Sequence, residues 1–280
     1  MLTVSQALKF YWIEHVAEKV LDKSRRDYAI ANIEEILGDD LTKDIHILRS
    51  REYRRERIAE GAKDSTIRYE LSLLQTAAQH CVKWQHLDAK DMPVIELPQG
   101  SEPRIIWIYK DELQELVKSA TGRALWFILL AYYTAGRKRS VESLERRQVD
   151  LEMRRINLHK KGAPKTKKRK PIVPIDPHIY DRLVTLLESH NSKWVLESDA
   201  DVRWEFNKAA EAAGLLDLPE RGLREAGRLT PHVLRHTRAT HLLQDGKSPF
   251  AVANLLGDNL MTVLRVYGHA CPDFMAEAIA

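Results

Sequence analysis

The sequence predicts a mainly α-helical protein (α+β) of two domains, with one small antiparallel β-hairpin in the second domain. Helical periodicity runs through most of the 280 residues, one segment has strand character, and a segment containing proline and glycine divides the chain. Apolar residues make up 44% of the chain, which is enough to bury a core. Lys and Arg total 44 against 40 acidic residues, so the placement of charge says more than the formal net charge of +4.

The first predicted domain, residues 1–95, is helical throughout. Apolar residues recur at helical spacing near its start: Val4, Ala7, Leu8 and Tyr11. A long amphipathic helix is expected from Asp64 onward, because the following apolar residues share one face: Ile67, Leu71, Leu74, Ala78 and Cys81. Residues 96–103, within a stretch that carries Pro93, Pro98, Gly100 and Pro103, are the predicted linker.

The second predicted domain, residues 104–280, is mostly helical around its hairpin. Residues 124–133 form an apolar run that is too short to cross a membrane and indicates a buried helix, expected over 124–135. A second helix is expected over 137–147. Residues 154–159 and 171–175 are the strand candidates, separated by a turn-rich tip. Helical periodicity then returns in five segments: 178–189, 202–213, 231–244, 249–256 and 261–267.

Three further signals complete this outline. Thr230 is the expected N-cap of the helix over 231–244, since Pro231 follows it at the first helical position. Cys81 and Cys271 have no His or Cys partner at metal-ligand spacing, so we expect reduced thiols and neither a metal nor another cofactor. The start of the chain lacks the pattern of a signal peptide, which favours a cytoplasmic protein without a membrane partner.

The segment 230–240 contains the first candidate site residues. His232, Arg235 and His236 are three and four residues apart, so they project from one side of the predicted helix. Burying such groups without an anion is costly, whereas a guanidinium matches phosphate and an imidazole can move a proton. A solvated basic helix face is the alternative, and for any single His it is the commoner one.

Three further features could carry chemistry, and each has an ordinary alternative. Arg137 follows Gly136, which would let the backbone approach a ligand closely, but a solvent-facing Arg is commoner. Tyr267 is either a packing residue or a nucleophile that must be activated, because an unperturbed phenol has a pKa of about 10. The hairpin tip is either a solvated loop or a contact for a phosphate backbone; its basic residues are Lys160, Lys161, Lys165, Lys167, Lys168, Arg169 and Lys170.

In this order and spacing, these features resemble the tyrosine recombinases of the phage-integrase type. The family's first box is similar to residues 134–151, with Arg137 at the position of the first catalytic arginine. Its second box, H-x-x-R-H, is matched by residues 232–236. Its third box, L-G-H with a tyrosine nine residues later, is similar to residues 256–258 followed by Tyr267. The N-terminal helices resemble the family's core-binding domain, and residues 104–280 its catalytic domain.

The resemblance implies a DNA strand-exchange enzyme. Arg137 and Arg235 would hold the scissile phosphate, and Tyr267 would attack the phosphorus to form a 3′-phosphotyrosine. His232 would assist as a general base or by bonding the phosphate. The leaving 5′-oxygen would take its proton from a hairpin lysine, for which counting back from Pro174 favours Lys165 and then Lys167. The other basic residues of the tip would contact DNA.

Two departures from the family pattern concern the same site. Asp258 stands where the family has a His that donates to the phosphate, and an ionised carboxylate can only accept and is repelled by phosphate. Asp258 is therefore expected to point away, to be protonated, or to leave the role to His269 or His236. Ser140 replaces a usually acidic residue that supports Arg137.

The resemblance also implies partners and leaves two alternatives open. The expected partners are double-stranded DNA with attachment-type sites, further copies of the chain in a tetramer assembled on DNA, and accessory DNA-bending or directionality proteins. Such a protein would be bacterial or phage-encoded and associated with the nucleoid when bound. The alternatives are a strand transferase that relaxes DNA with the same residues, and a catalytically impaired DNA-binding protein, which Asp258 and Ser140 motivate.

Overall fold

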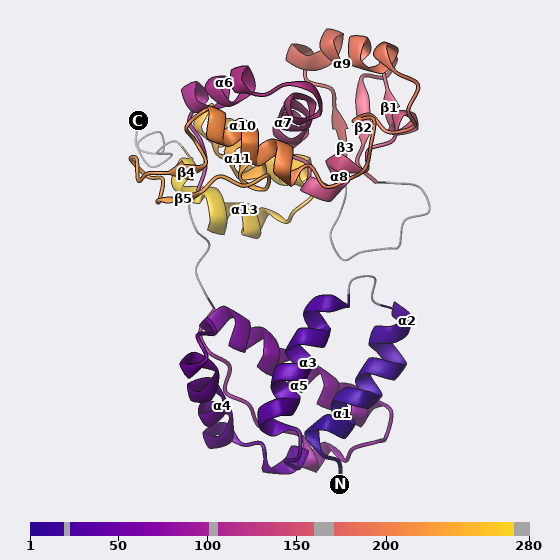
Figure 1. The fold of residues 1–280 in the computed structure, drawn as a ribbon, viewed down its shortest axis with the longest axis vertical. Helices are drawn as coiled ribbons and strands as arrows, with labels where there is room; N and C mark the ends of the chain where they lie inside the picture. The colour runs from indigo at the N-terminus through magenta and orange to yellow at the C-terminus, as the bar shows by residue number, and fades with distance from the viewer. Residues whose placement is uncertain (20–22, 101–105, 160–170, 272–280) are drawn as a thin grey trace. The chain divides into compact units, whose positions relative to one another are not determined.

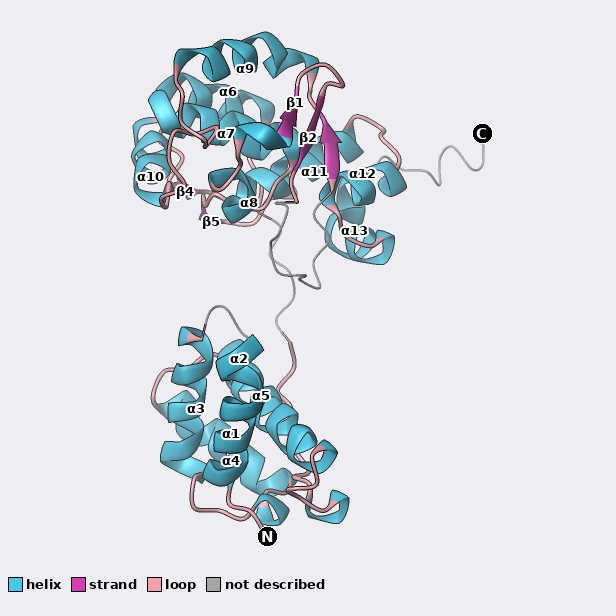
Figure 2. Cartoon of the chain, turned by 90° about the vertical axis from the view of Figure 1, so that its right-hand side faces the viewer, coloured by secondary structure: helices cyan, strands magenta, loops and turns pink. Residues whose placement is uncertain are grey.

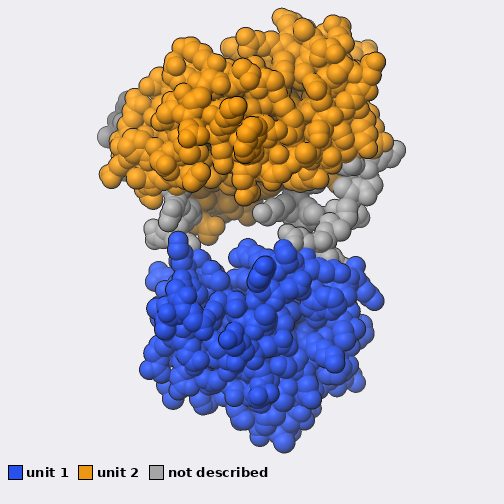
Figure 3. Space-filling view, in the orientation of Figure 1, with its two compact units in different colours: residues 1–102 blue, residues 103–280 orange. Residues whose placement is uncertain are grey.

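The computed structural model describes residues 1–19, 23–100, 106–159 and 171–271. They belong to two compact units, Met1–Glu102 and Pro103–Ala280, which Figure 3 colours separately. Both units consist mainly of α-helices, and the second adds short antiparallel strands, so the predicted fold class is confirmed. Among the described residues, no helix combines the length and the apolar composition needed to span a membrane.

Unit 1 is a helical bundle in which α1, α3 and α4 pack against the long helix α5 (Figure 1). The α5 face expected from the sequence is the buried one, and Ile67, Leu71 and Leu74 are completely inaccessible. A short π-helical stretch, Trp12–Val16, joins α1 to α2. The helices are α1 (Val4–Tyr11), α2 (Ala17–Lys19), α3 (Ser24–Leu37), α4 (Ile47–Ala59) and α5 (Asp64–Lys83).

A buried polar cluster attaches α4 to α5. Glu70 on α5 is 1% exposed, and it accepts hydrogen bonds from the Tyr53 hydroxyl at 2.8 Å and from Arg57 Nη2 at 2.9 Å. Asn32 on α3 donates to the same carboxylate at 3.0 Å. Because α4 buries only Ser50 and Tyr53, charge-assisted bonds replace much of the apolar contact that usually fixes a helix.

Unit 2 is built around α7, most of whose residues are buried, and which contacts α6, α8, α10 and α11. The three-stranded sheet lies at one edge of the unit (Figures 1 and 2). Its residues Ile156 and Val173 belong to the buried core. The helices are α6 (Lys110–Ser119), α7 (Gly122–Thr134), α8 (Lys138–Glu142), α9 (Pro177–Ser189), α10 (Arg203–Ala212), α11 (Val233–Gln244), α12 (Pro249–Leu256) and α13 (Leu260–Tyr267). The strands are β1 (Val149–Asp150), β2 (Arg155–Asn157), β3 (Ile172–Pro174), β4 (Asp217–Leu218) and β5 (Gly227–Arg228).

The structure differs from the sequence predictions in several places. The predicted hairpin gains a third strand, β1, which pairs Val149 with Ile156. The helix expected over 137–147 is wrong in extent, because α8 ends at Glu142 and a separate 3-10 turn, Arg146–Gln148, follows. The helix expected from Pro231 begins only at Val233, since a tight turn bonds the Val233 N–H to the carbonyl of Thr230. Thr230 is therefore not the N-cap.

Candidate active site

Arg235 is the most deeply placed cation of the site. It lies on the first turns of α11 and is 4% exposed. Its Nη1 donates to the carbonyl of Ala135 at 2.7 Å, and its Nη2 donates to the carbonyl of Leu256 at 2.8 Å. The guanidinium thus bonds the ends of α7 and α12. Burial lowers the pKa of Arg235, with a further contribution from the neighbouring charge of Arg137.

Arg137 reaches the same place from the turn between α7 and α8. Ala135 ends α7 in the left-handed conformation at φ 49°, and Arg137 occupies the N-cap of α8. Gly136 sits between them in a tight space, because a Cβ there would lie 2.7 Å from Val141 Cγ2 and 2.9 Å from Thr134 Oγ1. Glycine is required here for packing of the turn itself.

Asp258 points into the site and bridges the two arginines. Gly257 ends α12 with φ 65°, and this turn directs the Asp258 side chain inward. One carboxylate oxygen lies 2.8 Å from Arg137 Nη2, and the other lies 2.5 Å from Arg235 Nη2. The expectation that Asp258 points away is therefore wrong. Arg137 takes a carboxylate partner from position 258, whereas position 140 carries a serine.

Tyr267 completes the site as the last residue of α13. Its side chain belongs to a small core cluster with Ala239, Leu256 and Val263, so it is a packing residue as well as a candidate nucleophile. The hydroxyl lies 2.9 Å from His236 Nδ1. Burial raises the pKa of Tyr267 to about 12 and lowers the pKa of His236 to about 4. At neutral pH the phenol is therefore protonated and the imidazole is neutral.

The remaining predicted site residues have different surroundings. His232 is exposed at the N-cap of α11, and its ring meets that of His236 edge-on with centroids 4.7 Å apart. His269 follows Tyr267 in a 3-10 turn, and burial lowers its pKa. The basic tip lies outside the described residues, so the structure does not place Lys160, Lys161, Lys165, Lys167, Lys168 or Arg169.

The structure thus brings together Arg137, Arg235, Asp258, His236 and Tyr267, from four segments of unit 2. The sequence predicted His236 as a possible DNA contact and as a possible substitute for the third-box His, and its contact with Tyr267 is new. Its position as the last residue of the H-x-x-R-H motif was the available signal. The two guanidinium groups can bind the oxygens of a phosphate, and a nucleophilic hydroxyl in the same site can attack its phosphorus. In the described part of the chain, no group of three or more His, Cys, Asp or Glu residues could hold a metal ion.

The buried His241 on α11 makes the stability of unit 2 depend on pH. It is 1% exposed, its Nδ1 lies 2.9 Å from the Tyr132 hydroxyl, and burial lowers its pKa to about 4. An unfolded His titrates at about 6.5, so between these values the unfolded state binds more protons and stability falls with falling pH. The loss for His241 is at most about 3 kcal/mol.

We expect the free energy of unfolding of unit 2 to decrease from about pH 6.5 down to about pH 4, as measured by urea denaturation. His236 contributes with the same sign, because its pKa is also lowered. The variant His241→Phe should flatten this dependence. An unchanged slope in His241→Phe would show that the imidazole is not the group that titrates.

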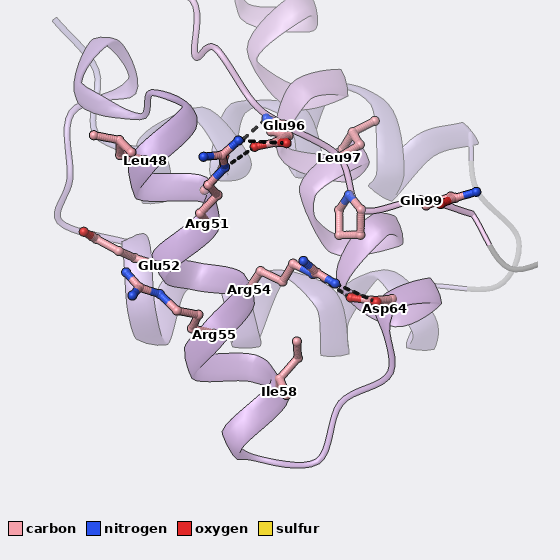
Figure 4. Close-up of a pocket in the computed structure, with 12 residues that line it drawn as sticks. Leu48, Arg51, Glu52, Arg54, Arg55, Ile58, Asp64, Glu96, Leu97 and Gln99 are labelled. Atoms are coloured by element: carbon pink, nitrogen blue, oxygen red, sulfur yellow. Dashed lines mark hydrogen bonds and ion pairs between the residues drawn. The ribbon is translucent and has the colours of Figure 1, made fainter.

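A hollow lies on unit 1, beside the arginines of α4. It has a volume of about 750 Å³. Figure 4 shows the ion pairs of Arg51 with Glu96 and of Arg54 with Asp64. The Arg54 pair has a distance of 2.7 Å, and the Arg55 side chain is exposed. The pairing with Glu96 fastens the first residue of the predicted linker to unit 1. These arginines form a basic helix face and carry no nucleophile.

Comparisons with known proteins show which family the chain resembles. The phage integrase family matches residues 106–272. The tyrosine recombinase XerC of Bacillus pumilus is 28% identical over 259 residues, covering 86% of this chain and 82% of the relative. XerA of Thermococcus kodakarensis is 25% identical and covers 74% of the chain and 73% of the relative.

Solved structures share the fold. The Tn1549 transposon integrase in complex with circular intermediate DNA superimposes with a TM-score of 0.79 at 16% identity, and the match covers 100% of both chains. A lambda integrase dimer bound to a COC′ core site gives 0.68 at 17% identity, covering 99% of this chain and 95% of the other. Since the family match extends over more than half of the sequence and contains the whole constellation around Tyr267, the chain belongs to the phage integrase family.

Proposed function

We propose that this chain is a site-specific tyrosine recombinase that cleaves and rejoins DNA through a 3′-phosphotyrosine. The observation that carries the proposal is that Asp258 joins Arg137 to Arg235, while His236, the residue after Arg235, contacts the Tyr267 hydroxyl in the same partly buried site. The XerC and XerA relatives, which are named as tyrosine recombinases, support the same activity. Neither a DNA-relaxing enzyme nor an impaired DNA-binding protein accounts better for these residues.

The arginines bind and polarise the scissile phosphate. A guanidinium offers several N–H donors in a fixed fork, and two of them around one phosphorus stabilise the charge that develops on the non-bridging oxygens. The site is partly buried, with side-chain exposures of 21% for Arg137 and 5% for Arg235, so these donors act in a medium of low polarity. His232, at the exposed end of the same helix, serves as an additional phosphate donor.

Attack by Tyr267 forms a bond from its oxygen to phosphorus and breaks the bond to the 5′-oxygen. The 5′-oxygen leaves with a proton that Lys165 supplies, or Lys167 if that lysine is the one that reaches the leaving oxygen. The phosphotyrosine bond retains the energy of the phosphodiester, so the second strand can be joined without a nucleotide cofactor.

The proposed partner is double-stranded DNA carrying attachment-type sites. The integrases of similar fold include ones solved with DNA, which supports this partner. The exposed arginines of α4 and the basic residues of the hairpin tip contact the phosphate backbone, and His269 lies close enough to Tyr267 in sequence to border the same DNA. Four copies assemble on two DNA sites in the cytoplasm, at the nucleoid, with accessory bending or directionality proteins.

Covalent trapping on DNA tests this proposal. Nicked half-site DNA from the junctions flanking the element that encodes the chain loses its broken end by diffusion, so a cleaved complex accumulates. We expect a protein–DNA adduct on a denaturing gel for the wild type, a phosphodiester attached to Tyr267 by peptide mapping, and no adduct for Tyr267→Phe, which retains DNA binding. A mobility shift without any adduct would overturn the proposal in favour of a DNA-binding protein with a disabled site.

A further inference from the structure

We infer that His236 is a catalytic residue of this site, the group that takes the proton from Tyr267 during cleavage and returns it during rejoining. This inference rests on the proposed function. It is carried by the distance of 2.9 Å between the Tyr267 hydroxyl and His236 Nδ1, which is a hydrogen bond to the reacting oxygen itself.

The pair is held in place from both sides. Tyr267 is 6% exposed, and its ring packs with residues of α11 and α12, among them Ala239 and Val252. The rings of His236 and Tyr267 lie with centroids 5.5 Å apart. Because the hydroxyl is in a buried setting, its proton needs an acceptor in the protein, and His236 is in hydrogen-bond reach.

His232 is placed differently. It lies one turn earlier, at the exposed N-cap of α11, with its ring edge-on to His236. His236 therefore stands between the more exposed imidazole and the nucleophile. This arrangement leaves His232 for the phosphate and solvent side of the site, and gives the acid–base step to His236.

The step balances as follows. The electron pair of the Tyr267 O–H bond forms the new bond to phosphorus, and the proton moves to Nδ1 of His236. The bond from phosphorus to the 5′-oxygen breaks, and that oxygen takes a proton from the hairpin lysine of the proposed function. In rejoining, the 5′-hydroxyl returns its proton to the lysine as its oxygen attacks phosphorus, the phosphotyrosine bond breaks, and Nδ1 returns its proton to the Tyr267 oxygen. The resting His236 must carry its hydrogen on Nε2.

Burial and nearby charge together determine where the shared proton of Tyr267 and His236 lies. Burial disfavours both the phenolate and the imidazolium, so the proton stays on Tyr267 at rest. A phosphate bound by Arg137 and Arg235 brings negative charge next to His236, and this favours the imidazolium. Proton transfer is thereby coupled to the arrival of the substrate.

Two substitutions of His236 separate proton transfer from positioning. In His236→Asn the amide oxygen replaces Nδ1 as a hydrogen-bond acceptor but cannot take the proton, and in His236→Ala the acceptor is absent. We expect both to lower the rate of adduct formation on nicked half-site DNA by about 100-fold or more. His178→Asn, a change of an exposed His on α9, is the matched control and should keep the wild-type rate. His232→Asn should lose less activity than His236→Asn.

A more acidic phenol at position 267 should restore part of the activity that His236→Asn loses. Incorporation of 3,5-difluorotyrosine at position 267 lowers the phenol pKa, so attack depends less on a proton acceptor. The His236→Asn protein with the fluorinated tyrosine should form the adduct at least about tenfold faster than His236→Asn with ordinary tyrosine, which is within the usual range of general-base contributions. A His236→Asn rate within about threefold of wild type, or a loss that fluorination does not relieve, would overturn the inference while wild-type adducts still support the proposed function.

An NMR measurement without DNA tests the role of His236 independently of whether the protein cleaves DNA. In protein labelled with ¹⁵N-histidine, the signal that disappears in His236→Asn identifies His236. We expect its shifts to report a bare Nδ1 that accepts a hydrogen bond and a protonated Nε2 at neutral pH. A hydrogen on Nδ1 would exclude His236 as the acceptor, whether or not the wild type cleaves DNA.

Discussion

Arg235→Lys is expected to lower the rate of DNA cleavage by about 100- to 1000-fold, the usual effect of removing one preorganised transition-state donor. Arg235 Nη1 donates to Ala135, and Arg235 Nη2 donates to both Leu256 and Asp258. The single ammonium of a lysine cannot reproduce this planar two-nitrogen fork. The positive charge is retained in this variant, so a large loss would be due to geometry. The measurement is the single-turnover rate of adduct formation on nicked half-site DNA.

The control for this prediction lies on the same helix. Arg238, three residues further along α11, pairs with Asp176 at 2.8 Å, and Arg238→Lys should cleave DNA at close to the wild-type rate. Urea denaturation of both variants measures any loss of stability, because Arg235 also satisfies two buried carbonyls at roughly 1 kcal/mol each. If Arg235→Lys cleaves within about threefold of wild type, the arginine is structural and does not bind the phosphate.

Asp258→Asn is expected to raise the rate of cleavage by about ten- to 100-fold at limiting DNA. The carboxylate of Asp258 occupies donors of Arg137 and Arg235 that the scissile phosphate requires. A carboxylate and a phosphate at about 4 Å repel each other by several kcal/mol at the effective dielectric constant of a protein surface. The amide has nearly the same shape without the charge, so it removes the repulsion and weakens the competition.

Two further variants define the cause of this effect. Asp258→His, which restores a hydrogen-bond donor to the position, should raise the rate at least as much as Asp258→Asn. Asp258→Ala separates charge from shape, since it removes both the repulsion and the contact that aligns the arginines. A fall in rate for Asp258→Asn would mean that the carboxylate holds the two guanidinium groups in their productive arrangement.

The fold class was predictable because periodicity reports burial. The apolar face of α5, with Ile67, Leu71 and Leu74, is buried as its spacing predicts, and α12 has the predicted bounds 249–256. Short elements were not predictable in this way. The strand β1 has two residues, too few for an alternating pattern, and it depends on pairing with β2.

The ends of elements were also decided by contacts distant in sequence. The helix after Arg137 stops at Glu142, and Glu145 instead forms a bridge with Trp194. The start of α11 was expected at Pro231 from local capping preferences, but the chain makes a turn there before Val233. Local preference is a weak prior that tertiary contacts override, and boundaries show this first.

By itself the sequence determined that the protein is helical, that Arg137, Arg235 and Tyr267 occur in the order and spacing of a tyrosine recombinase, and that Asp258 departs from the pattern. Only the tertiary structure decided that Asp258 turns inward between the arginines and that His236 meets Tyr267. The reason is physical: periodicity and motifs describe residues close along the chain, whereas Arg137 and Asp258 are 121 residues apart and meet only because the core packs α7, α11, α12 and α13 together.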